Sequence, residues 1–458
     1  MALDAIIARF IEHSPVTVMA RLALGRALDA QWIDELFEQH REQQYTRQLL
    51  FSTTVDLMSL VAVGLRPSLH AAAKAATDLP VSMTALYDKV NGTEPGLVRA
   101  LVAGSAARLT PVIEAMSPAP LVSVPGYRVR ILDGNHLAAS EKRLKPLRGF
   151  RGAALPGQSL VVYDPDRDMV LDMIPCEDGH TQERALMEPL LATSGIGDLW
   201  ITDRNFCTRP ILCGWHRQSS SFLVREHGRN PNPRELGQAK KIGKTPTGTV
   251  FEQLVSIDDD DGCPVQLRRI ELRLNKPTED GEMVIRLLTN LPASEFSAVE
   301  LATLYRRRWR IEMMFQRLES VLQSEIPALG HPRAALLAFG VAILAYNVLA
   351  LISRAITVQH QLDTEKLEIS SYYVAITIKA DYAGMMIAVE PSAWDIYEKF
   401  SALKLAQTLL HIAAHAQPLR LRKHPRGPKA RVKKGYVSRR AAQRHVATAR
   451  VIKDGKII

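Results

Sequence analysis

The most informative stretch of the chain is LYRRRWRIEMMFQRLESVLQSE, residues 304–325. Tyr305, Arg308 and Glu312 stand at positions i, i+3 and i+7, so a helix would place all three along one face. Apolar residues recur at helical spacing and lie mostly away from that face: Trp309, Ile311, Met314, Phe315, Leu318, Val321 and Leu322. A carboxylate one turn beyond an arginine and two turns beyond a tyrosine suits an active-site helix that holds a metal ion and a phosphate together.

Two aspartates upstream each follow a short segment with the pattern of a β-strand. Asp133 stands in YRVRILDGNHLA, where apolar and charged residues alternate before an Asp-Gly-Asn turn, so we expect the strand to stop at this aspartate. Asp203 follows the apolar run 199–201 in DLWITDRNFCTRP. Because active sites of open α/β sheets collect at strand ends, we expect Asp133 and Asp203 to lie near Glu312.

Three converging carboxylates are typical of a site for two hard divalent cations that act on a phosphodiester. The four cysteines, Cys176, Cys207, Cys213 and Cys263, have no CxxC spacing, which argues against a zinc site. Each acidic residue taken alone has an ordinary structural alternative, a turn or cap aspartate or a solvated glutamate. The combination with Tyr305 and Arg308 favours a catalytic site.

These motifs resemble those of the DDE transposases of bacterial insertion sequences, specifically the insertion-sequence-four-like branch. The signature of that branch is Tyr-x2-Arg-x3-Glu-x6-Lys, and its first three positions and the two preceding Asp blocks have matches here: Tyr305, Arg308, Glu312, Asp133 in LDGNHLA and Asp203 in TDRNF. The segments EKRLKPLRG, RLLTNLP and RKHPRGPK are also similar, so the resemblance spans about residues 120–440. The signature Lys falls on Glu319, so either Arg317 or another base compensates for it, or the helix turns Glu319 away.

The resemblance implies a DNA transposase. Asp133, Asp203 and Glu312 would be catalytic and bind two divalent metal ions, Mg²⁺ with Mn²⁺ able to substitute, while Tyr305 and Arg308 would bind a DNA phosphate. Water would hydrolyse a phosphodiester at the element's end, and the freed 3′-hydroxyl would attack the opposite strand or the target. The implied partners are double-stranded DNA, as terminal inverted repeats and as target, and a second subunit in a synaptic homodimer, with no membrane.

Two alternatives remain open from the residues. One is a metal-dependent nuclease of the same fold that never joins strands. The other is a catalytically impaired, transposase-derived DNA-binding regulator, which Glu319 favours. Inverted repeats flanking the coding sequence would distinguish an active element from such a regulator.

The expected fold class is α/β, an RNase H-like mixed-sheet catalytic core with a β-rich insertion, a helical N-terminal domain and a basic C-terminal tail. The expected boundaries are 1–118 for the helical DNA-binding domain, 119–226 and 293–417 for the two parts of the core, 227–292 for the insertion and 418–458 for the tail. Strands are expected at 127–133, 159–163, 169–174, 249–257, 265–274 and 282–288, and helices at 181–192 and 210–218. None of the five tryptophans lies in the insertion, so Phe251 or another apolar residue would replace the tryptophan that some relatives are thought to stack on a flipped base.

The N-terminal segment has the rhythm of a helix-turn-helix over 70–76, TDLP and 82–90, with Ser82 as an N-cap. An ordinary αα-hairpin is equally compatible with it. If the segment reads DNA, the contacting residues would be Ser82, Thr84, Tyr87 and Lys89.

Charge is unevenly spread along the chain. The net charge is +10, yet residues 418–458 hold fourteen Lys/Arg and one acid, which predicts a flexible tail that binds polyanions. In the insertion, the basic segment 234–244 suits either a phosphate-tracking loop or a solvated one, and the four-Asp run 258–261 suits a solvated turn better than a metal site.

The uncharged segment 334–353, AALLAFGVAILAYNVLALIS, is nearly long enough to span a bilayer. It directly follows the expected catalytic helix, so we interpret it as a buried core helix. The start of the chain shows no signal peptide and cysteines are few, which predicts a cytoplasmic protein. The resemblance to insertion-sequence transposases implies a bacterial, nucleoid-associated one.

Overall fold

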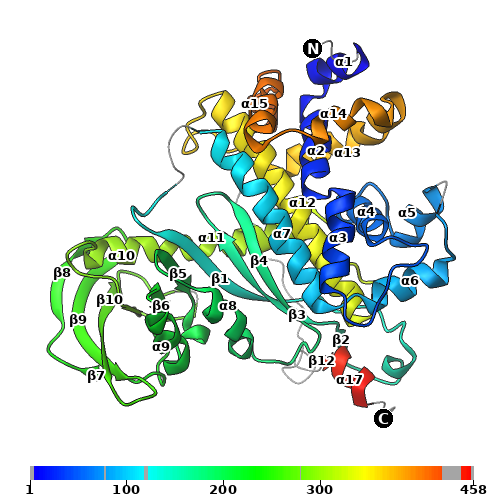
Figure 1. The fold of residues 1–458 in the computed structure, drawn as a ribbon. Coiled ribbons are helices and arrows are strands. Elements are labelled where there is room, and N and C mark those ends of the chain that lie inside the picture. Colours follow the sequence, from blue (N-terminus) through cyan, green and yellow to red (C-terminus); the bar gives the residue numbers. More distant parts are fainter. Residues whose placement is uncertain (1–4, 77–78, 118–121, 279, 425–444, 455–458) are drawn as a thin grey trace.

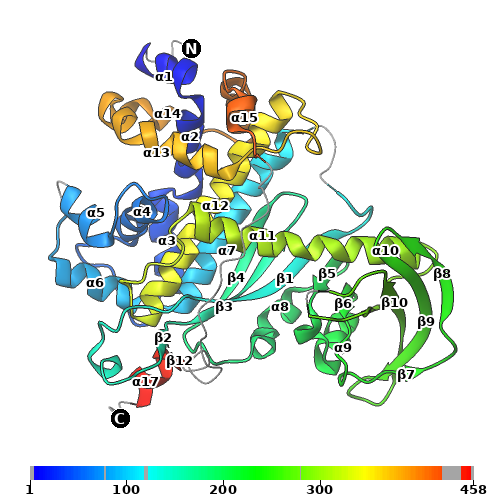
Figure 2. The ribbon, with the colours of Figure 1, turned by 180° about the vertical axis from the view of Figure 1, so that it is seen from behind.

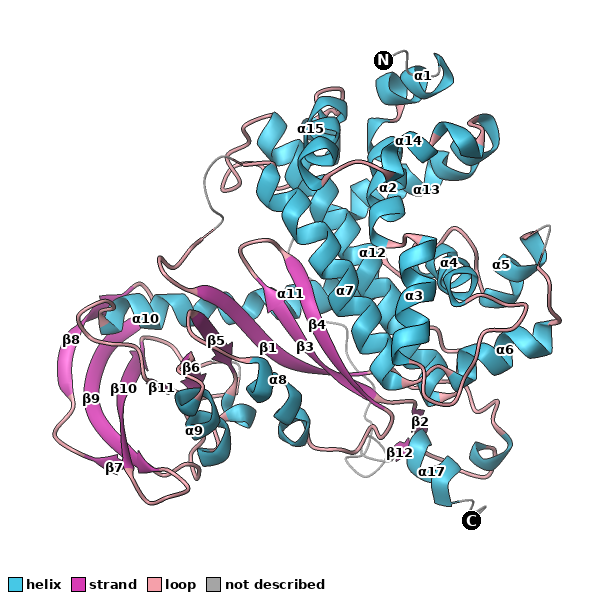
Figure 3. Cartoon of the chain, viewed as in Figure 1, coloured by secondary structure: helices cyan, strands magenta, loops and turns pink. Residues whose placement is uncertain are grey.

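The computed structural model describes residues 5–76, 79–117, 122–278, 280–424 and 445–454, and it has the predicted mixed α/β fold (Figures 1 and 3). Helices from both ends of the chain gather on one side of a long twisted sheet. The expected C-terminal tail lies largely outside these residues, because 425–444 and 455–458 are not described.

A ten-stranded mixed sheet forms the centre of the protein, in the order β4-β3-β1-β5-β6-β11-β10-β9-β7, with β8 also paired to β9. β1 and β5 are parallel, as are β5 and β6, and the other pairs are antiparallel. The core strands are β1 (Arg128–His136), β3 (Gln158–Asp164), β4 (Met169–Cys176), β5 (Asp198–Thr202) and β6 (Ser221–Arg225). The predicted hairpin at 159–174 is confirmed as β3 and β4.

The strands expected in the insertion are confirmed and extend the same sheet. They are β9 (Gly248–Asp258), β10 (Pro264–Leu274) and β11 (Val284–Thr289), preceded by β7 (Arg234–Glu235) and β8 (Lys240–Thr245). β11 pairs with β6 of the core, so the ladder runs without interruption from core to insertion. At the far end these strands curl around one another beside α10 (Figures 1 and 2).

Two of these local predictions were wrong, and a third was confirmed. β1 does not stop at Asp133 but continues to His136, because its second half pairs with β3. The helix expected at 181–192 is a 3-10 turn, η2 (Glu183–Leu186), followed by the short α8 (Glu188–Thr193), which has a proline in its first turn. The helix expected at 210–218 is present as α9 (Arg209–Arg217).

The signature segment is not one continuous helix. α10 (Ala298–Tyr305) and α11 (Trp309–Val321) are separated by a 3-10 turn, η4, over Arg306–Arg308. A tighter turn shifts the helical phase, and Trp309, expected on the apolar face, is 59% exposed. Ile311, Met314 and Leu318 do face the core.

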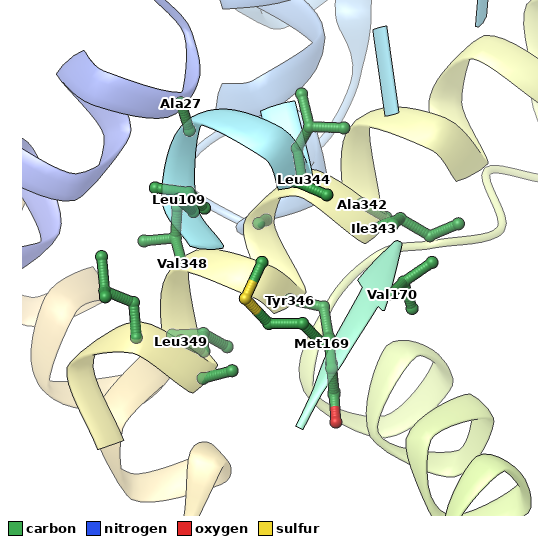
Figure 4. Packing of buried hydrophobic residues seen from close by; sticks show 14 of the residues in the cluster. Ala27, Leu109, Met169, Val170, Ala342, Ile343, Leu344, Tyr346, Val348 and Leu349 are labelled. Atoms are coloured by element: carbon green, nitrogen blue, oxygen red, sulfur yellow. The ribbon is translucent and has the colours of Figure 1, made fainter. Parts of the chain in front are cut away.

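The helical part of the protein is built around α12 (Pro332–Gln359), whose residues 334–352 are all buried. It packs against α7 (Pro95–Ala115), α2 (Pro15–Ala27), α4 (Phe51–Ala62) and α15 (Ala402–Ala413), so N- and C-terminal helices share one core. Figure 4 shows Val348 of α12 beside Leu109 of α7, and Ile343 of α12 beside Val170 of β4, within this core. The buried position of α12 confirms the core-helix interpretation, although α7 and α12 are both long and apolar enough to cross a membrane by length and composition.

The segment with helix-turn-helix rhythm forms α5 (Leu69–Ala75) and α6 (Met83–Gly92). Ser82 caps α6 as predicted, since its hydroxyl accepts a hydrogen bond from the Ala85 N–H. The Lys89 ammonium, however, lies 3.7 Å from the ring centre of Phe37, and burial lowers the pKa of Lys89 to about 8. Lys89 therefore packs within the helical part, while Thr84 is exposed.

Both described ends of the C-terminal region contact the rest of the protein. Lys423 pairs with Glu368 at 2.6 Å, and the Ser370 N–H donates to the Leu421 carbonyl. Beyond the undescribed residues, β12 (His445–Ala447) pairs in parallel with β2 (Ala153–Leu155), and α17 (Thr448–Asp454) packs its Val451 against Leu147.

Candidate active site

Strand alternation places the two aspartates on one face of the sheet. Ile131 of β1 and Ile201 of β5 pack into the same hydrophobic core as Ile311 of α11. Side chains two residues apart share a face, so Asp133 and Asp203 are directed to the α11 side as well. The parallel register pairs Leu132 with Thr202, which makes the two aspartates neighbours across the strand pair.

Arg308 connects the sheet to the helix. Its guanidinium donates from Nη1 to Asp133 Oδ2 at 3.2 Å and from Nη2 to Glu312 Oε1 at 2.6 Å. The Arg308 side chain is only 11% exposed, against 33% for Glu312. The structure thus brings three of the predicted residues into direct contact, with Asp203 beside them.

The carboxylates around Asp133 outnumber the basic groups, so the site has an excess of negative charge. Burial raises the pKa of Asp133 to about 7, Arg308 opposes this rise, and the carboxylates of Asp203 and Glu183 add to it. A second donor, the Gly134 N–H, reaches Asp133 Oδ1 at 3.0 Å. One arginine and one backbone N–H do not compensate the buried carboxylate, so a further cation here would be favourable.

Tyr305 lies close to Asp133, Asp203 and Arg308. Its ring is 8% exposed, and its hydroxyl is buried without a hydrogen-bond partner among the described residues. Burial raises the pKa of Tyr305, so the hydroxyl keeps its proton and remains a donor. Asp133, Asp203 and Arg308 all lie within electrostatic range of it.

Sequence reasoning missed two residues that contact the site, Glu183 and Asn205. The Asn205 N–H donates to Asp203 Oδ1 at 2.8 Å, and its side-chain Nδ2 donates to Glu183 Oε2 at 2.5 Å. Asn205 is part of the TDRNF block and could have been suspected from its place two residues after the aspartate. Glu183 follows an irregular segment, and no period or motif singles it out.

The carboxylates of Asp133, Asp203 and Glu312 suit a hard divalent cation, although they are not arranged in a complete coordination geometry. Within the ranges that the structure describes, no three His, Cys, Asp or Glu side chains are grouped closely enough to hold a metal ion. Arg308 lies between Asp133 and Glu312. Carboxylate oxygens are the ligands that Mg²⁺ prefers, and the raised pKa of buried Asp133 shows that the site would accept more positive charge.

Glu319 and Arg317 lie on different sides of α11. Glu319 is exposed, and no ion pair forms with it in the described part of the chain. Arg317 pairs with Asp168 at 2.8 Å and with Glu368 at 3.0 Å, so its guanidinium does not serve the position of the signature Lys. The four-Asp run forms a turn in which Arg217 pairs with Asp260.

Two insertion features also have definite places. Phe251, the candidate for base stacking, has the Arg273 guanidinium 3.9 Å from its ring centre, so one face of the ring is covered. Lys240, Lys241 and Lys244 belong to β8 rather than to a loop, and all three are exposed.

Comparison with known proteins agrees with this geometry. Residues 125–348 match the family model of the transposase DDE domain. "Putative transposase y4zB" of Sinorhizobium fredii is 26% identical over 201 residues, 42% of this chain and 52% of that protein. "Transposase for insertion sequence element IS421" of Escherichia coli is 53% identical over 38 residues, 8% of this chain and 10% of that protein. The matched part thus spans about half of the first relative and a tenth of the second.

The mixed sheet, the clustered acidic residues and the family match define residues 125–348 as a transposase DDE domain. The chain therefore contains a transposase DDE domain and is similar to the DDE transposases of bacterial insertion sequences.

Proposed function

We propose that the protein cleaves DNA at the ends of an insertion sequence and joins the freed ends to target DNA. The observation that carries this proposal is the Arg308 bridge, which links Asp133 of the sheet to Glu312 of α11 beside Asp203. Metal-dependent phosphodiester cleavage uses carboxylates to bind the cations, an arginine can bind the phosphate, and this cluster lies within a transposase DDE domain.

Each side chain has a distinct task in this proposal. Asp133, Asp203 and Glu312 would hold two divalent cations, Mg²⁺ or Mn²⁺, which when bound activate the attacking oxygen and stabilise the leaving one. Arg308 presents a planar fork that can bind two phosphate oxygens, and Tyr305 offers a buried hydroxyl that has no partner within the described residues. Without a cation, Arg308 holds Asp133 and Glu312 near each other because it forms an ion pair with each of them.

The substrates would be the terminal inverted repeats and a target duplex, bound in the cytoplasm of a bacterium by two subunits. Cutting two ends together requires two copies of the site. The assignment to the insertion-sequence-four-like branch belongs to the same proposal and depends on Tyr305, Arg308 and Glu312.

Alanine substitution of each carboxylate tests the proposal. With Mg²⁺ and DNA that carries the element's ends, Asp133→Ala, Asp203→Ala and Glu312→Ala should each reduce strand cleavage below detection, because an apolar group cannot bind a cation. Binding of the ends, measured by gel shift, should be largely kept. Asp261→Ala, an exposed aspartate of the insertion, is the matched control and should cleave normally.

If one of the three variants cleaves at nearly the wild-type rate, the carboxylate assignment is wrong. The same assay addresses the alternatives. A wild-type protein that cleaves but never joins ends would be a nuclease. A wild-type protein that binds ends without cleaving them would be a regulator, which the exposed acid Glu319 favours.

A further inference from the structure

Glu183 belongs to no motif, yet it contacts both aspartate-bearing segments. It begins η2, between the β3–β4 hairpin and α8. Its Oε2 accepts the hydrogen bond from Asn205 Nδ2 at 2.5 Å, and the backbone N–H of Asn205 donates to Asp203 Oδ1 at 2.8 Å. Asn205 therefore connects the Glu183 carboxylate to the Asp203 carboxylate.

The other carboxylate oxygen of Glu183 lies on Gly134. A Cβ added at Gly134 would be 2.0 Å from Glu183 Oε1 and 2.7 Å from its Cγ, so only a residue without a side chain leaves room for Glu183. The N–H of Gly134 donates to Asp133 Oδ1 at 3.0 Å. Glu183 thus contacts β1 at the residue next to Asp133 and contacts the η3 turn (Arg204–Phe206) next to Asp203.

We propose that Glu183 is a positioning residue that orients Asp203 for cation binding through the side chain of Asn205. This inference rests on the proposed function. Asp203 follows the last residue of β5, so the strand ladder does not restrain its carboxylate. The carboxylate of Asp203 is restrained instead by the hydrogen bond from the Asn205 N–H. Because Glu183 holds the side-chain amide of Asn205, it keeps the η3 turn in one conformation. Residues that orient metal-binding carboxylates typically change metal affinity or activity by about 10–100-fold when removed.

Substitutions at Glu183 separate a hydrogen-bond acceptor from a charge. Glu183→Ala removes the acceptor and should lower both Mn²⁺ affinity, measured by calorimetry without DNA, and the single-turnover cleavage rate by about 10–100-fold. Glu183→Gln keeps an oxygen that accepts from Asn205, so both values should stay within about threefold of wild type. Binding of DNA ends and melting temperature should change little in either variant. The control is Glu188→Ala, an exposed glutamate five residues away.

Gly134→Ala tests the same contact from the other side. The new methyl group would displace the flexible end of the Glu183 side chain, which costs little folding energy. It should therefore reproduce the Glu183→Ala defect and add almost nothing in a Glu183→Ala background. Asn205→Ala should behave in the same way, because all three changes interrupt one connection and neighbouring sites of one network are not additive.

The outcomes distinguish this inference from the proposed function. If the wild type and Asp203→Ala are equally unable to bind Mn²⁺ and to cleave, the proposed function fails and takes the inference with it. If the wild type is active and Asp203→Ala is not, a Glu183→Ala protein that matches wild type overturns the role of Glu183 alone. A Glu183→Gln protein as defective as Glu183→Ala also overturns positioning, because the negative charge would then be what matters. A Glu183→Ala protein that fails to fold leaves the decision to Glu183→Gln and Asn205→Ala.

Discussion

Two arginines nine residues apart, Arg308 and Arg317, make similar ion pairs in very different surroundings. Arg308 bridges Asp133 at 3.2 Å and Glu312 at 2.6 Å, and Arg317 bridges Asp168 at 2.8 Å and Glu368 at 3.0 Å. Each arginine connects its helical segment to a carboxylate of the sheet region. Ion pairing by itself does not distinguish a functional site from a structural one.

The surrounding donors make the difference. At Asp168, the hydroxyls of Tyr163 and Tyr346 both donate to Oδ1, at 2.5 and 2.6 Å, so the carboxylate is fully satisfied. At Asp133 the nearby tyrosine, Tyr305, has a buried hydroxyl without a partner in the described part of the protein, and acids outnumber bases. The Arg317 cluster is complete as it stands, whereas the Arg308 cluster has unused donors and an excess of negative charge, as expected of a site that binds cations and phosphate.

The largest effect should come from breaking the Arg308 cluster. Arg308→Ala removes the fork proposed to bind phosphate, and the loss of one such preorganised donor typically costs about 10²–10³-fold in rate. Arg308→Lys keeps the charge but not the two-pronged geometry, so it should recover only part of the loss. Single-turnover cleavage of DNA ends measures both. Cleavage by Arg308→Ala within about threefold of wild type would contradict the role of Arg308.

Breaking the Arg317 cluster should instead affect stability. Arg317→Met leaves Asp168 and Glu368 without their shared cation. We expect the free energy of unfolding to fall by about 2 kcal/mol, between the loss for an exposed pair and that for a fully buried one, because Arg317 is 23% exposed and Asp168 is 42% exposed. The cleavage rate well below the melting temperature should be kept. Lys423→Ala, which removes the exposed partner of Glu368, should cost about 0–1 kcal/mol in the same denaturant titration. A large loss of cleavage without a loss of stability would reverse the comparison.

The helices and strands, and the proximity of Asp133, Arg308 and Glu312, were easier to predict from the sequence than the local backbone geometry around these residues. Alternation along β1 and β5 and the spacing of Tyr305, Arg308 and Glu312 follow from backbone periodicity, so the face and the neighbours could be foreseen. The 3-10 turn at 306–308 could not, because three consecutive arginines are compatible with an uninterrupted helix. The continuation of β1 beyond Asp133 depends on pairing with β3, which is a tertiary effect.

Other features depended on contacts between segments far apart in the chain. Glu183 reaches Gly134 and Asn205 from an irregular segment, and local pattern carries no information about such an approach. The joining of N-terminal helices to α12 in one core also follows from packing rather than from the apolar pattern of either segment. Conversely, the burial of 334–352 was predictable, since the segment is apolar all around.

The raised pKa of Asp133 predicts a pH dependence that the Arg308 cluster should show. Burial raises the pKa from its ordinary value to about 7, so the folded protein binds the proton more tightly than the unfolded chain does. The stabilisation of the folded protein by the proton on Asp133 is fully present below about pH 4 and is lost as pH rises through about 7. In chelator, Asp133→Asn should therefore match wild type near pH 4 and be more stable by about 2 kcal/mol at pH 8. Mg²⁺ should reduce the difference at pH 8 by stabilising only the wild type.

Thermal unfolding at several pH values, with and without Mg²⁺, measures this difference. The control is Asp168→Asn in the satisfied cluster, which should destabilise the protein at pH 8 because it weakens the pairing with Arg317. Equal stability of Asp133→Asn and wild type at pH 8 would show that the Asp133 carboxylate is adequately compensated by Arg308.

The smallest expected effect concerns Glu319, the acid at the position of the signature Lys. It lies seven residues beyond Glu312, about two turns along α11, on the exposed surface. Arg317 is committed to Asp168 and Glu368, so it does not neutralise Glu319. Burial raises the pKa of the neighbouring Glu325, and the negative charge of Glu319 adds to that rise.

Glu319→Lys should therefore help rather than harm. The repulsion between the Glu319 carboxylate and a bound phosphate would be replaced by an attraction between a lysine ammonium and that phosphate. We expect pre-cleaved ends to bind about 2–5-fold more tightly, with a similar gain in cleavage, because a single exposed charge contributes about 0.5–1 kcal/mol. Glu319→Gln should give about half of that gain, since it removes the repulsion without adding a cation. Melting temperature should not fall, as no described ion pair is lost. Gel-shift titrations at two salt concentrations decide the matter: a gain that persists unchanged at high salt would not be electrostatic, and a loss of binding with Lys would mean that the DNA phosphate lies elsewhere.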